Sequence, residues 1–342
     1  MADGHSDTRS VPSPDSGRDC DLLIVGAGPV GLFGAFYAGL RGLSVTVMDT
    51  LPMAGGQIMA MYPEKDILDV AGFARVKGRD LVDGLLDQLK PYEPRWLLDE
   101  QATDLVVAAD HVRVTGAGGG QVRAGAVVLT SGIGSFTPKP LPAATTWSHG
   151  GVLHFVERPV ELTGRDVVIV GGGDSAVDWA LLLYPVASSI TVVHRRDRFR
   201  AHAATLQRAR DLGVRFVVPG VVEELLGDGH LTGVRLADPT TGTRSEMPAD
   251  VVVAALGFHA ELGPLAEWGL TLDGRHVVVD PTGATGLERV YAAGDLVTYP
   301  GKVALLATGF GEVATAVNNA AAMLDPHVGI FPGHTTALTE AR

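Results

Sequence analysis

Two glycine-rich turns, far apart in the sequence, constrain the fold of this chain more than any other feature. Residues 26–31 (Gly-Ala-Gly-Pro-Val-Gly) follow the apolar run 22–25, and residues 171–176 (Gly-Gly-Gly-Asp-Ser-Ala) follow the apolar run 167–170. A buried strand, a glycine turn and a helix in this order place a dinucleotide pyrophosphate at the helix N-terminus. One such match also arises from packing alone, but two matches predict two dinucleotide-binding units.

The residue that ends the second strand of each unit differs in charge between the two units. Asp49 lies 18 residues after Gly31, where a carboxylate accepts hydrogen bonds from a ribose diol. Arg195 and Arg196 lie 19 and 20 residues after Ala176, where guanidinium groups bind a 2′-phosphate. The sequence therefore predicts a dinucleotide with an unphosphorylated ribose in the first unit and NADP in the second.

Composition and charge agree with this interpretation. A chain of 342 residues is long enough for two domains, and 46% hydrophobic residues with 44 glycines suit buried parallel strands joined by tight turns. No apolar run approaches the roughly 18 residues of a membrane span. The net charge of −12 argues against a nucleic-acid partner. We therefore expect an α/β protein that contacts neither membrane nor nucleic acid.

The N-terminus and the cysteine content bear on the compartment. Residues 1–18 are rich in Ser, Asp, Gly and Pro and lack the apolar segment of a signal peptide, which predicts a disordered tail. Cys20 is the only cysteine, so a disulfide cannot form within this chain, and we interpret Cys20 as a small apolar residue. Without an export signal or a cysteine pair, the prediction is a cytoplasmic protein.

The order of the expected elements indicates that one unit is inserted into the other. After the first unit, the sequence predicts a helix over 80–90, then short strands over 102–107, 111–115 and 121–129. A strand over 290–293 and a helix over 309–323 follow the second unit. The expected domains are a tail (1–18), a discontinuous first domain (19–131 and 262–342), and an NADP-binding domain (132–261).

Several motifs carry a resemblance to a known family. The segment 293–295 (Ala-Gly-Asp) is typical of flavoprotein reductases with two dinucleotide domains. From Cys20 to the C-terminus, the chain resembles the thioredoxin-reductase-like (type 2) ferredoxin/flavodoxin–NADP reductases. Ordinary thioredoxin reductases share the glycine motifs but lack the Tyr-Pro-Glu-Lys segment and the tail. The segments that carry the resemblance are 55–57, 62–65, 69–73, 194–202, 294–311 and 332–336.

The resemblance implies a fold and an activity. It implies an α/β fold of two Rossmann-like domains, with the NADP domain inserted into the FAD domain. It also implies FAD and NADP(H) as cofactors, a ferredoxin or flavodoxin as a transient partner, and a homodimer. Electrons would pass between NADPH and a one-electron carrier through bound FAD, so neither a catalytic acid–base residue nor a metal is expected.

The resemblance also assigns an FAD site. Asp49 would bind the adenosine ribose, and the amides after Gly28 the pyrophosphate. Asp295 would bind the ribityl chain, while Tyr62 and His334 would cover the two faces of the flavin. The complete implied set is Gly26, Gly28, Pro29, Val30, Gly31, Asp49, Gly56, Gln57, Tyr62, Ala102, Phe136, Gly294, Asp295, His334 and Thr336.

The implied NADP site surrounds the second glycine turn and the basic segment after it. Its residues are Gly171, Gly173, Asp174, Ser175, Ala176, His194, Arg195, Arg196 and Arg200. Plainer interpretations stay open for several assigned residues. Tyr62 suits an ordinary half-buried tyrosine, Asp295 a helix cap, His334 a frayed terminus, and the arginines a solvated basic face.

Partner docking and function also keep alternatives. Arg75, Lys77 and Arg79 form a candidate positive patch for an acidic ferredoxin, although a solvated loop face explains them equally well. One alternative function is an FAD-dependent NADPH oxidoreductase with a small acceptor, such as a quinone, dioxygen or a biosynthetic intermediate. The other is a non-catalytic NADPH-sensing module.

Overall fold

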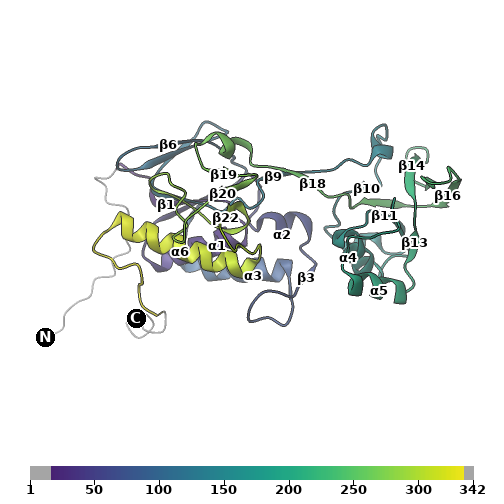
Figure 1. The fold of residues 1–342 in the computed structure, drawn as a ribbon, viewed down its shortest axis with the longest axis horizontal. Helices are drawn as coiled ribbons and strands as arrows, with labels where there is room; N and C mark the ends of the chain where they lie inside the picture. The colour runs from purple at the N-terminus through teal and green to yellow at the C-terminus, as the bar shows by residue number, and fades with distance from the viewer. Residues whose placement is uncertain (1–16, 335–342) are drawn as a thin grey trace. The chain divides into compact units, whose positions relative to one another are not determined.

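The computed structural model describes residues 17–334, which form two compact units. Unit 1 contains the described residues up to Ser135 and those from Glu261 onward, and unit 2 is Phe136–Ala260. The chain thus leaves unit 1 once and returns to it, as the colour sequence in Figure 1 shows. Residues 1–16, most of the predicted tail, and 335–342, which include Thr336, lie outside the described residues.

A mixed sheet forms the centre of unit 1. Strand β1 (Cys20–Val25) lies between β2 (Val45–Met48) and β8 (Gln121–Leu129), parallel to both. The sheet order is β5-β2-β1-β8-β7-β6, and β21 also pairs with β8. The outer strands are β5 (Arg95–Leu97), β6 (Ala102–Val107), β7 (Val112–Gly116) and β21 (Val290–Ala292).

Both faces of β1 are buried from Leu22 to Val25, which explains the uninterrupted apolar sequence of that stretch. Leu22 and Ile24 pack with three helices, α1 (Pro29–Leu40), α3 (Gly78–Leu89) and α6 (Leu306–Leu324), which Figure 1 shows together. Leu23 and Val25 point into a second apolar cluster, with residues between 265 and 297. Because β1 is fixed on both sides, the turn that follows it has a fixed position.

The remaining elements of unit 1 are short and lie near the ends of the central strands. Helix α2 follows the first βαβ unit, and β3 and β4 form an antiparallel hairpin just after it. Their bounds are α2 (Gly56–Met61), β3 (Asp66–Ile67), β4 (Val76–Lys77), η1 (Lys90–Tyr92), η4 (Gly263–Glu267), β19 (Leu272–Asp273), β20 (His276–Val278), η5 (Gly294–Leu296) and β22 (Val297–Thr298).

Unit 2 repeats the strand, turn and helix of unit 1 in a five-stranded parallel sheet of order β10-β17-β11-β12-β13. Helix α4 (Asp174–Leu183) follows β11, and α5 (Ala203–Asp211) follows β12. The strands are β10 (Val152–Leu153), β11 (Asp166–Val170), β12 (Ser189–Val193), β13 (Arg215–Val217) and β17 (Val251–Ala254). The 3₁₀ turns η2 (Pro142–Ala144) and η3 (Pro159–Leu162) precede β11.

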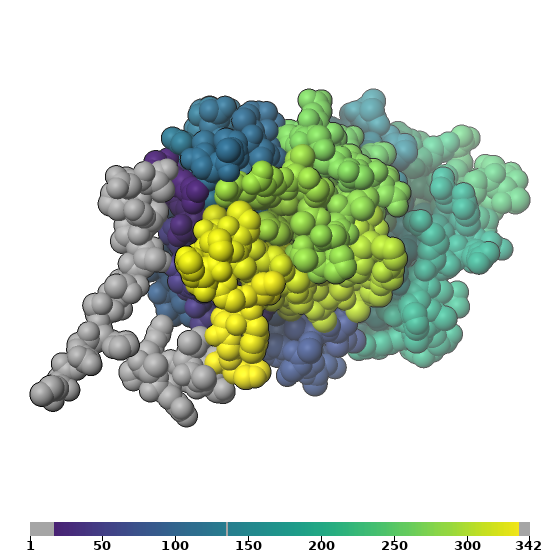
Figure 2. Space-filling model, turned by 60° about the vertical axis from the view of Figure 1, so that its left-hand side comes forward, coloured from purple at the N-terminus to yellow at the C-terminus, as the bar shows by residue number. Residues whose placement is uncertain are grey.

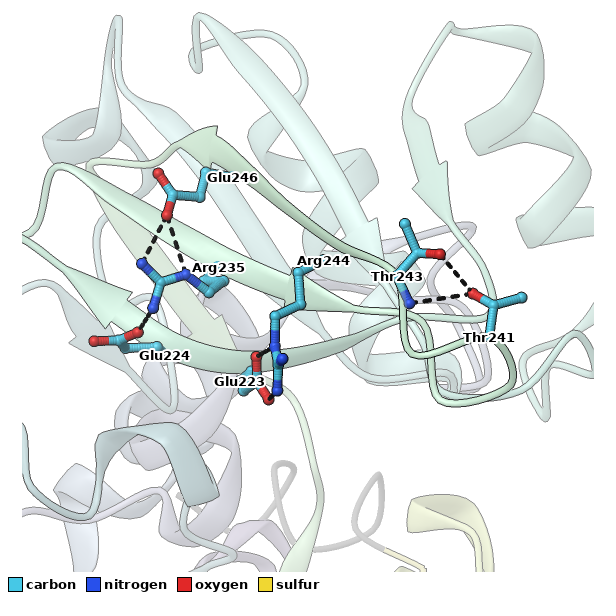
Figure 3. A network of polar contacts seen from close by, with 7 residues as sticks. All are labelled: Glu223, Glu224, Arg235, Thr241, Thr243, Arg244 and Glu246. Atoms are coloured by element: carbon cyan, nitrogen blue, oxygen red, sulfur yellow. Dashed lines mark hydrogen bonds and ion pairs between the residues drawn. The ribbon is translucent and has the colours of Figure 1, made fainter.

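Unit 2 also carries a three-stranded antiparallel sheet that the sequence analysis did not predict: β14 (Val221–Leu226), β15 (Gly233–Ala237) and β16 (Arg244–Pro248). Arg235 on the central strand lies opposite Glu224 and Glu246 and pairs with both, as Figure 3 shows. Arg244 binds Glu223 through two hydrogen bonds of 2.6 and 2.7 Å. Exposed pairs of this kind contribute little stability each, about 0–1 kcal/mol.

Two paired strands, β9 (Ser135–Pro138) and β18 (Phe258–Glu261), carry the chain into and out of unit 2. The ring of Phe258 stacks on Phe155 at 5.2 Å and meets the edge of Phe136 at 5.9 Å. Phe136, predicted to line the flavin site, therefore has aromatic partners within unit 2. Its contact with a flavin stays a prediction.

Candidate functional site

The first glycine turn needs glycine at two positions for steric reasons. Gly26 has φ +114°, and a Cβ there would lie 2.5 Å from the Thr130 carbonyl oxygen. A Cβ on Gly31 would lie 1.8 Å from the Gly26 oxygen. Gly28 differs, because the nearest atom to its Cβ position is the Cα of Gly56, at 4.0 Å. The middle glycine thus leaves an open space at the N-terminus of α1, which fits a phosphate that approaches the backbone closely.

Helix α2 forms the second wall of this space. The Gly55 amide donates to the Ala27 oxygen at 2.8 Å, and a Cβ on Gly56 would lie only 2.8 Å from the Gly28 Cα. Gln57 follows directly, and its Nε2 lies 3.1 Å from the Cβ position of Gly132. The structure thus brings Gly56 and Gln57 beside the first turn, where the FAD site was predicted.

Asp49 bridges the turn and the loop after β2. Its Oδ2 accepts a hydrogen bond from the Ala27 amide at 2.5 Å, and its Oδ1 accepts one from the Leu51 amide at 2.8 Å. Burial raises the pKa of this carboxyl group, although both hydrogen bonds act in the opposite direction. A carboxylate oxygen accepts more than one hydrogen bond, so Asp49 retains acceptor capacity for a ribose diol.

The residues predicted to contact the adenosine lie next to Asp49. The Glu100 amide donates to the Asp49 carbonyl oxygen at 2.9 Å, which holds the segment before β6 next to Asp49. Ala102 is the first residue of β6 and is buried. The structure therefore brings Ala102 close to Asp49 in the fold, as an adenine-contacting backbone requires.

The turn that contains Asp295 packs against the start of α1. A Cβ on Gly294 would lie 3.3 Å from Val30 Cγ2, and one on Gly309 would lie 2.6 Å from the same atom. Gly294 has φ +81°, a conformation that favours glycine. The Asp295 side chain is exposed, next to the glycine that packs against the start of α1.

Tyr62 lies at the C-terminus of α2 and is half-buried. Burial raises the pKa of its hydroxyl, and the negative charges of Asp295 and Asp69 add to the effect. The charge of Asp295 thus acts on Tyr62, so two predicted flavin contacts from distant segments interact electrostatically. The Lys65 ammonium lies 5.9 Å from the centre of the Tyr62 ring.

The C-terminal segment, by contrast, is held at the other end of α1. Arg41, at the C-terminus of that helix, donates hydrogen bonds to the Gly329 and Ile330 carbonyl oxygens at 2.9 and 3.2 Å. The ring of the exposed His334 lies 5.3 Å from that of Phe331. A helix of 12 residues is about 18 Å long. The contact of His334 with a flavin stays a prediction, and that of Thr336 lies outside the described residues.

The second glycine turn is wrapped by the segment that follows β12. A Cβ on Gly172 would lie 2.3 Å from the His194 ring, so the histidine packs directly on the turn. The Arg200 amide donates a hydrogen bond to the Gly172 oxygen at 2.7 Å. The Asp174 carboxylate accepts one from the His202 amide at 2.8 Å. Among residues 17–334, apart from its two chain neighbours, no atom lies within 4 Å of the Cβ position of Gly173, which leaves open space at the N-terminus of α4.

Three arginines lie around this turn. Arg195, Arg196 and Arg200 are exposed, and within residues 17–334 none of the three forms an ion pair. Burial lowers the pKa of His194, and the positive charges of the three arginines lower it further. Three neighbouring cations without a bound anion repel one another, and a phosphate would relieve that repulsion. The arrangement fits a 2′-phosphate site.

The candidate docking patch is less positive than its sequence indicates. Lys77 and Arg79 both pair with Glu64, at 3.0 and 3.1 Å, and Arg75 pairs with Asp66 at 3.3 Å. The hydrogen bonds from Lys77 and Arg79 lower the pKa of Glu64. Because the carboxylates of the same hairpin compensate these cations, the pairs favour the solvated loop face.

Sequence reasoning missed two residues at the end of β8. Thr130 donates its hydroxyl to the Gly26 oxygen at 2.8 Å. The Ser131 backbone nitrogen lies 2.8 Å from the Cβ position of Gly26, and its buried hydroxyl has no hydrogen-bond partner among residues 17–334. An unsatisfied buried hydroxyl beside the turn fits a polar ligand. In the sequence, the only sign of these two residues was a threonine and a serine directly after a predicted buried strand.

A reactive thiol, a metal site and a membrane-spanning helix find little support in the part of the chain that the structure describes. Burial raises the pKa of the Cys20 thiol to about 11, so it stays protonated and unreactive at neutral pH. Between residues 17 and 334, no group of three or more His, Cys, Asp or Glu side chains is arranged to hold a metal. No helix in that range is long and apolar enough to cross a bilayer.

Comparisons with known proteins agree with this geometry. The chain matches the pyridine nucleotide-disulphide oxidoreductase family over residues 20–320. It is 57% identical over 319 residues to a ferredoxin–NADP reductase of Salinispora arenicola and 58% identical to that of Salinispora tropica, with 93% of this chain and 99% of each relative covered. Among solved structures, the thioredoxin reductase of T. acidophilum superposes with a TM-score of 0.75 at 25% identity, over 90% of this chain and 99% of that one.

The predicted fold class, α/β with two Rossmann-like domains, is therefore confirmed. The match to the family covers far more than half of the chain, and the two relatives are similar along almost their whole length. The chain belongs to the pyridine nucleotide-disulphide oxidoreductase family.

Proposed function

We propose that this protein is an FAD-dependent ferredoxin/flavodoxin–NADP reductase, which moves electrons between NADPH and a one-electron protein carrier. The observation that carries the proposal is the charge difference between the two glycine turns. Asp49 lies at the first turn, and Arg195, Arg196 and Arg200 lie at the second. The relatives named ferredoxin–NADP reductase, at 57–58% identity, support the same activity.

In this proposal, unit 1 holds FAD along the edge formed by α1, α2 and the Asp295 turn. The backbone at Gly28 accommodates the pyrophosphate, and Asp49 accepts hydrogen bonds from the adenosine ribose. Asp295 binds the ribityl chain, while Tyr62 offers an aromatic surface to the flavin. When bound, FAD supplies the conversion between two-electron hydride transfer and single-electron transfer.

Unit 2 holds NADPH in the same proposal. The open N-terminus of α4 at Gly173 receives the pyrophosphate, and Arg195, Arg196 and Arg200 bind the 2′-phosphate. His194 packs on Gly172 and fixes the loop on the turn. The chain itself binds and orients the two dinucleotides, and neither hydride nor electron transfer requires a protein acid or base.

A spectroscopic and kinetic experiment tests the proposal. The purified protein should be yellow, and anaerobic NADPH should bleach its flavin absorbance. Cytochrome c reduction should then depend on an added ferredoxin or flavodoxin. A colourless protein that binds NADPH would instead indicate the sensing module. Fast NADPH oxidation by a quinone or dioxygen, with no gain from any carrier, would indicate the small-acceptor enzyme.

A homodimer is part of the proposal, and the C-terminal segment supports it. Ile330 and Phe331 are 57% and 68% exposed, and the last described residues lie on the surface of unit 1 (yellow in Figure 2). Apolar side chains this exposed favour burial against a second copy. Sedimentation of the full chain and of a Phe331→Ser variant tests this, since a monomeric full chain would contradict it. Location in the cytoplasm stays a prediction, and cell fractionation would test it.

A further inference from the structure

A polar cluster, largely shielded from solvent, lies behind the turn that carries Asp295. Glu312, on α6, accepts hydrogen bonds from the Tyr299 hydroxyl at 2.6 Å and from the Lys302 ammonium through Oε1. Its other oxygen, Oε2, accepts a hydrogen bond from the Gly294 backbone amide at 2.8 Å. The Lys302 and Glu312 side chains are only 10% and 12% exposed. One carboxylate thus joins α6, the segment before it and the Asp295 turn.

A largely buried ion pair of this kind is weak evidence of added stability. Taking a carboxylate and an ammonium out of water costs several kcal/mol per ion, and well-packed apolar residues often stabilise such a position equally well. The Glu312 hydrogen bond raises the pKa of Tyr299 to about 12, so the hydroxyl remains a donor at neutral pH. The cluster is therefore a satisfied polar network that ends at the Gly294 amide.

Fixing that amide fixes the residue after it. Gly294 lies in the left-handed region, and Val30 closes the space beside it. With its amide hydrogen bonded to Glu312, the peptide plane before Gly294 has one orientation. The exposed Asp295 side chain leaves the next position of the chain. No other side chain in the described residues bonds the Gly294 amide.

We propose that Glu312 is a positioning residue for the flavin cofactor: held by Lys302 and Tyr299, it orients the Gly294 amide and so directs the Asp295 carboxylate to the ribityl chain. This inference rests on the proposed function, since it requires FAD in unit 1. Glu312 itself touches the turn and not the cofactor.

The test measures FAD affinity, independently of turnover. Apoprotein of each variant is titrated with FAD, and binding is followed by the quenching of flavin fluorescence. Glu312→Gln retains the size of the side chain but removes its charge, and should raise the dissociation constant for FAD about tenfold, a loss of one charge-assisted hydrogen bond. Tyr299→Phe and Lys302→Met should raise it less. Glu288→Gln, an exposed glutamate of unit 1, serves as the matched control.

A double-variant cycle separates positioning from a general structural role. If Glu312 acts through Asp295, then Asp295→Asn and the Asp295→Asn/Glu312→Gln pair should have the same dissociation constant for FAD. Binding of 2′,5′-ADP to unit 2 should be unchanged in all variants. Additive effects of the two substitutions, or a Glu312→Gln variant that binds FAD like wild type, would overturn the inference.

Two further outcomes have distinct meanings. A wild-type apoprotein that does not bind FAD at all contradicts the proposed function, and the inference fails with it. If Glu312→Gln does not fold, Tyr299→Phe takes its place in the cycle, because it removes a single hydroxyl. A Tyr299→Phe variant with wild-type FAD affinity would then overturn the inference while leaving the proposed function intact.

Discussion

The two glycine turns share a local architecture but differ in how the groups predicted to contact the ribose are held. Asp49 is partly buried and already accepts hydrogen bonds from two backbone amides, so its position is fixed by the fold of unit 1. Arg195, Arg196 and Arg200 are exposed and without ion pairs within residues 17–334. The first site is organised before any ligand binds, whereas the second gains its compensating charge from the ligand. This difference suits a resident FAD and an exchanging NADPH.

The largest expected effect removes the cations of the second site. In an Arg195→Ala/Arg196→Ala variant, we expect the KM for NADPH to rise roughly 100-fold, since each charge-assisted hydrogen bond contributes about 1.5–3 kcal/mol. The KM for NADH should hardly change. Steady-state kinetics with both nucleotides tests this, with the neighbouring Arg198→Ala as the control. An equal loss for both nucleotides would show that these arginines do not read the 2′-phosphate.

The second effect concerns Asp49, where a substitution should affect both FAD binding and the stability of the apoprotein. Asp49→Asn should weaken FAD binding about tenfold and also lower the free energy of unfolding of the apoprotein by about 1–3 kcal/mol, because one backbone amide loses its acceptor. The arginine variant should leave apoprotein stability unchanged. Chemical denaturation of both apoproteins makes the comparison. If Asp49→Asn were as stable as wild type, the first site would be no more organised than the second.

A pair of glycine substitutions sharpens the same contrast. Gly56→Ala should destabilise unit 1 by about 1–3 kcal/mol even without ligand, because Gly56 has φ +55° and its Cβ would lie 2.8 Å from the Gly28 Cα. Gly173→Ala should leave the stability unchanged and weaken only NADP binding, since no atom lies near its Cβ position. Thermal unfolding and 2′,5′-ADP titration measure the two effects. Destabilisation of the apoprotein by Gly173→Ala would be the unexpected result.

The smallest effect is the pH dependence of unit 2. The pKa of His194 is lower in the folded chain than its ordinary value, so the unfolded chain binds the proton more readily. Stability should therefore decline as the pH falls through about 6.5, the pKa of unfolded histidine, and level off below the folded pKa. The decline in Tm should be small, and absent in His194→Gln. The opposite slope would contradict the lowered pKa.

How much the sequence predicted follows from how local each feature is. Each glycine turn and its strand and helix lie within one βαβ unit, so pattern and spacing were sufficient to predict them. The ribose contacts of Asp49, Arg195 and Arg196 stay a prediction. The contacts of Glu312 with Gly294, and of Thr130 with Gly26, join segments distant in sequence and leave no periodic signal. For the same reason, the pairing of Lys77 and Arg79 with Glu64 was visible only in three dimensions.

The boundaries of helices show a similar limit. The last helix was expected to begin at Gly309 but begins at Leu306. Glycine usually weakens a helix interior, so local propensity disfavours Gly309 inside a helix. In the structure, Gly309 lies inside α6 because its missing Cβ lets Val30 of α1 approach. A packing requirement from another helix therefore decided the position that local propensity predicted wrongly.

Calorimetric titration of the FAD-loaded protein with 2′,5′-ADP and with 5′-AMP tests the central claim most directly. We expect one tightly held flavin per chain and a preference for 2′,5′-ADP of roughly 100-fold, which the Arg195→Ala/Arg196→Ala variant loses. A protein that retains no flavin, or that binds the two adenosine ligands equally, would contradict the assignment of oppositely charged sites to two different dinucleotides.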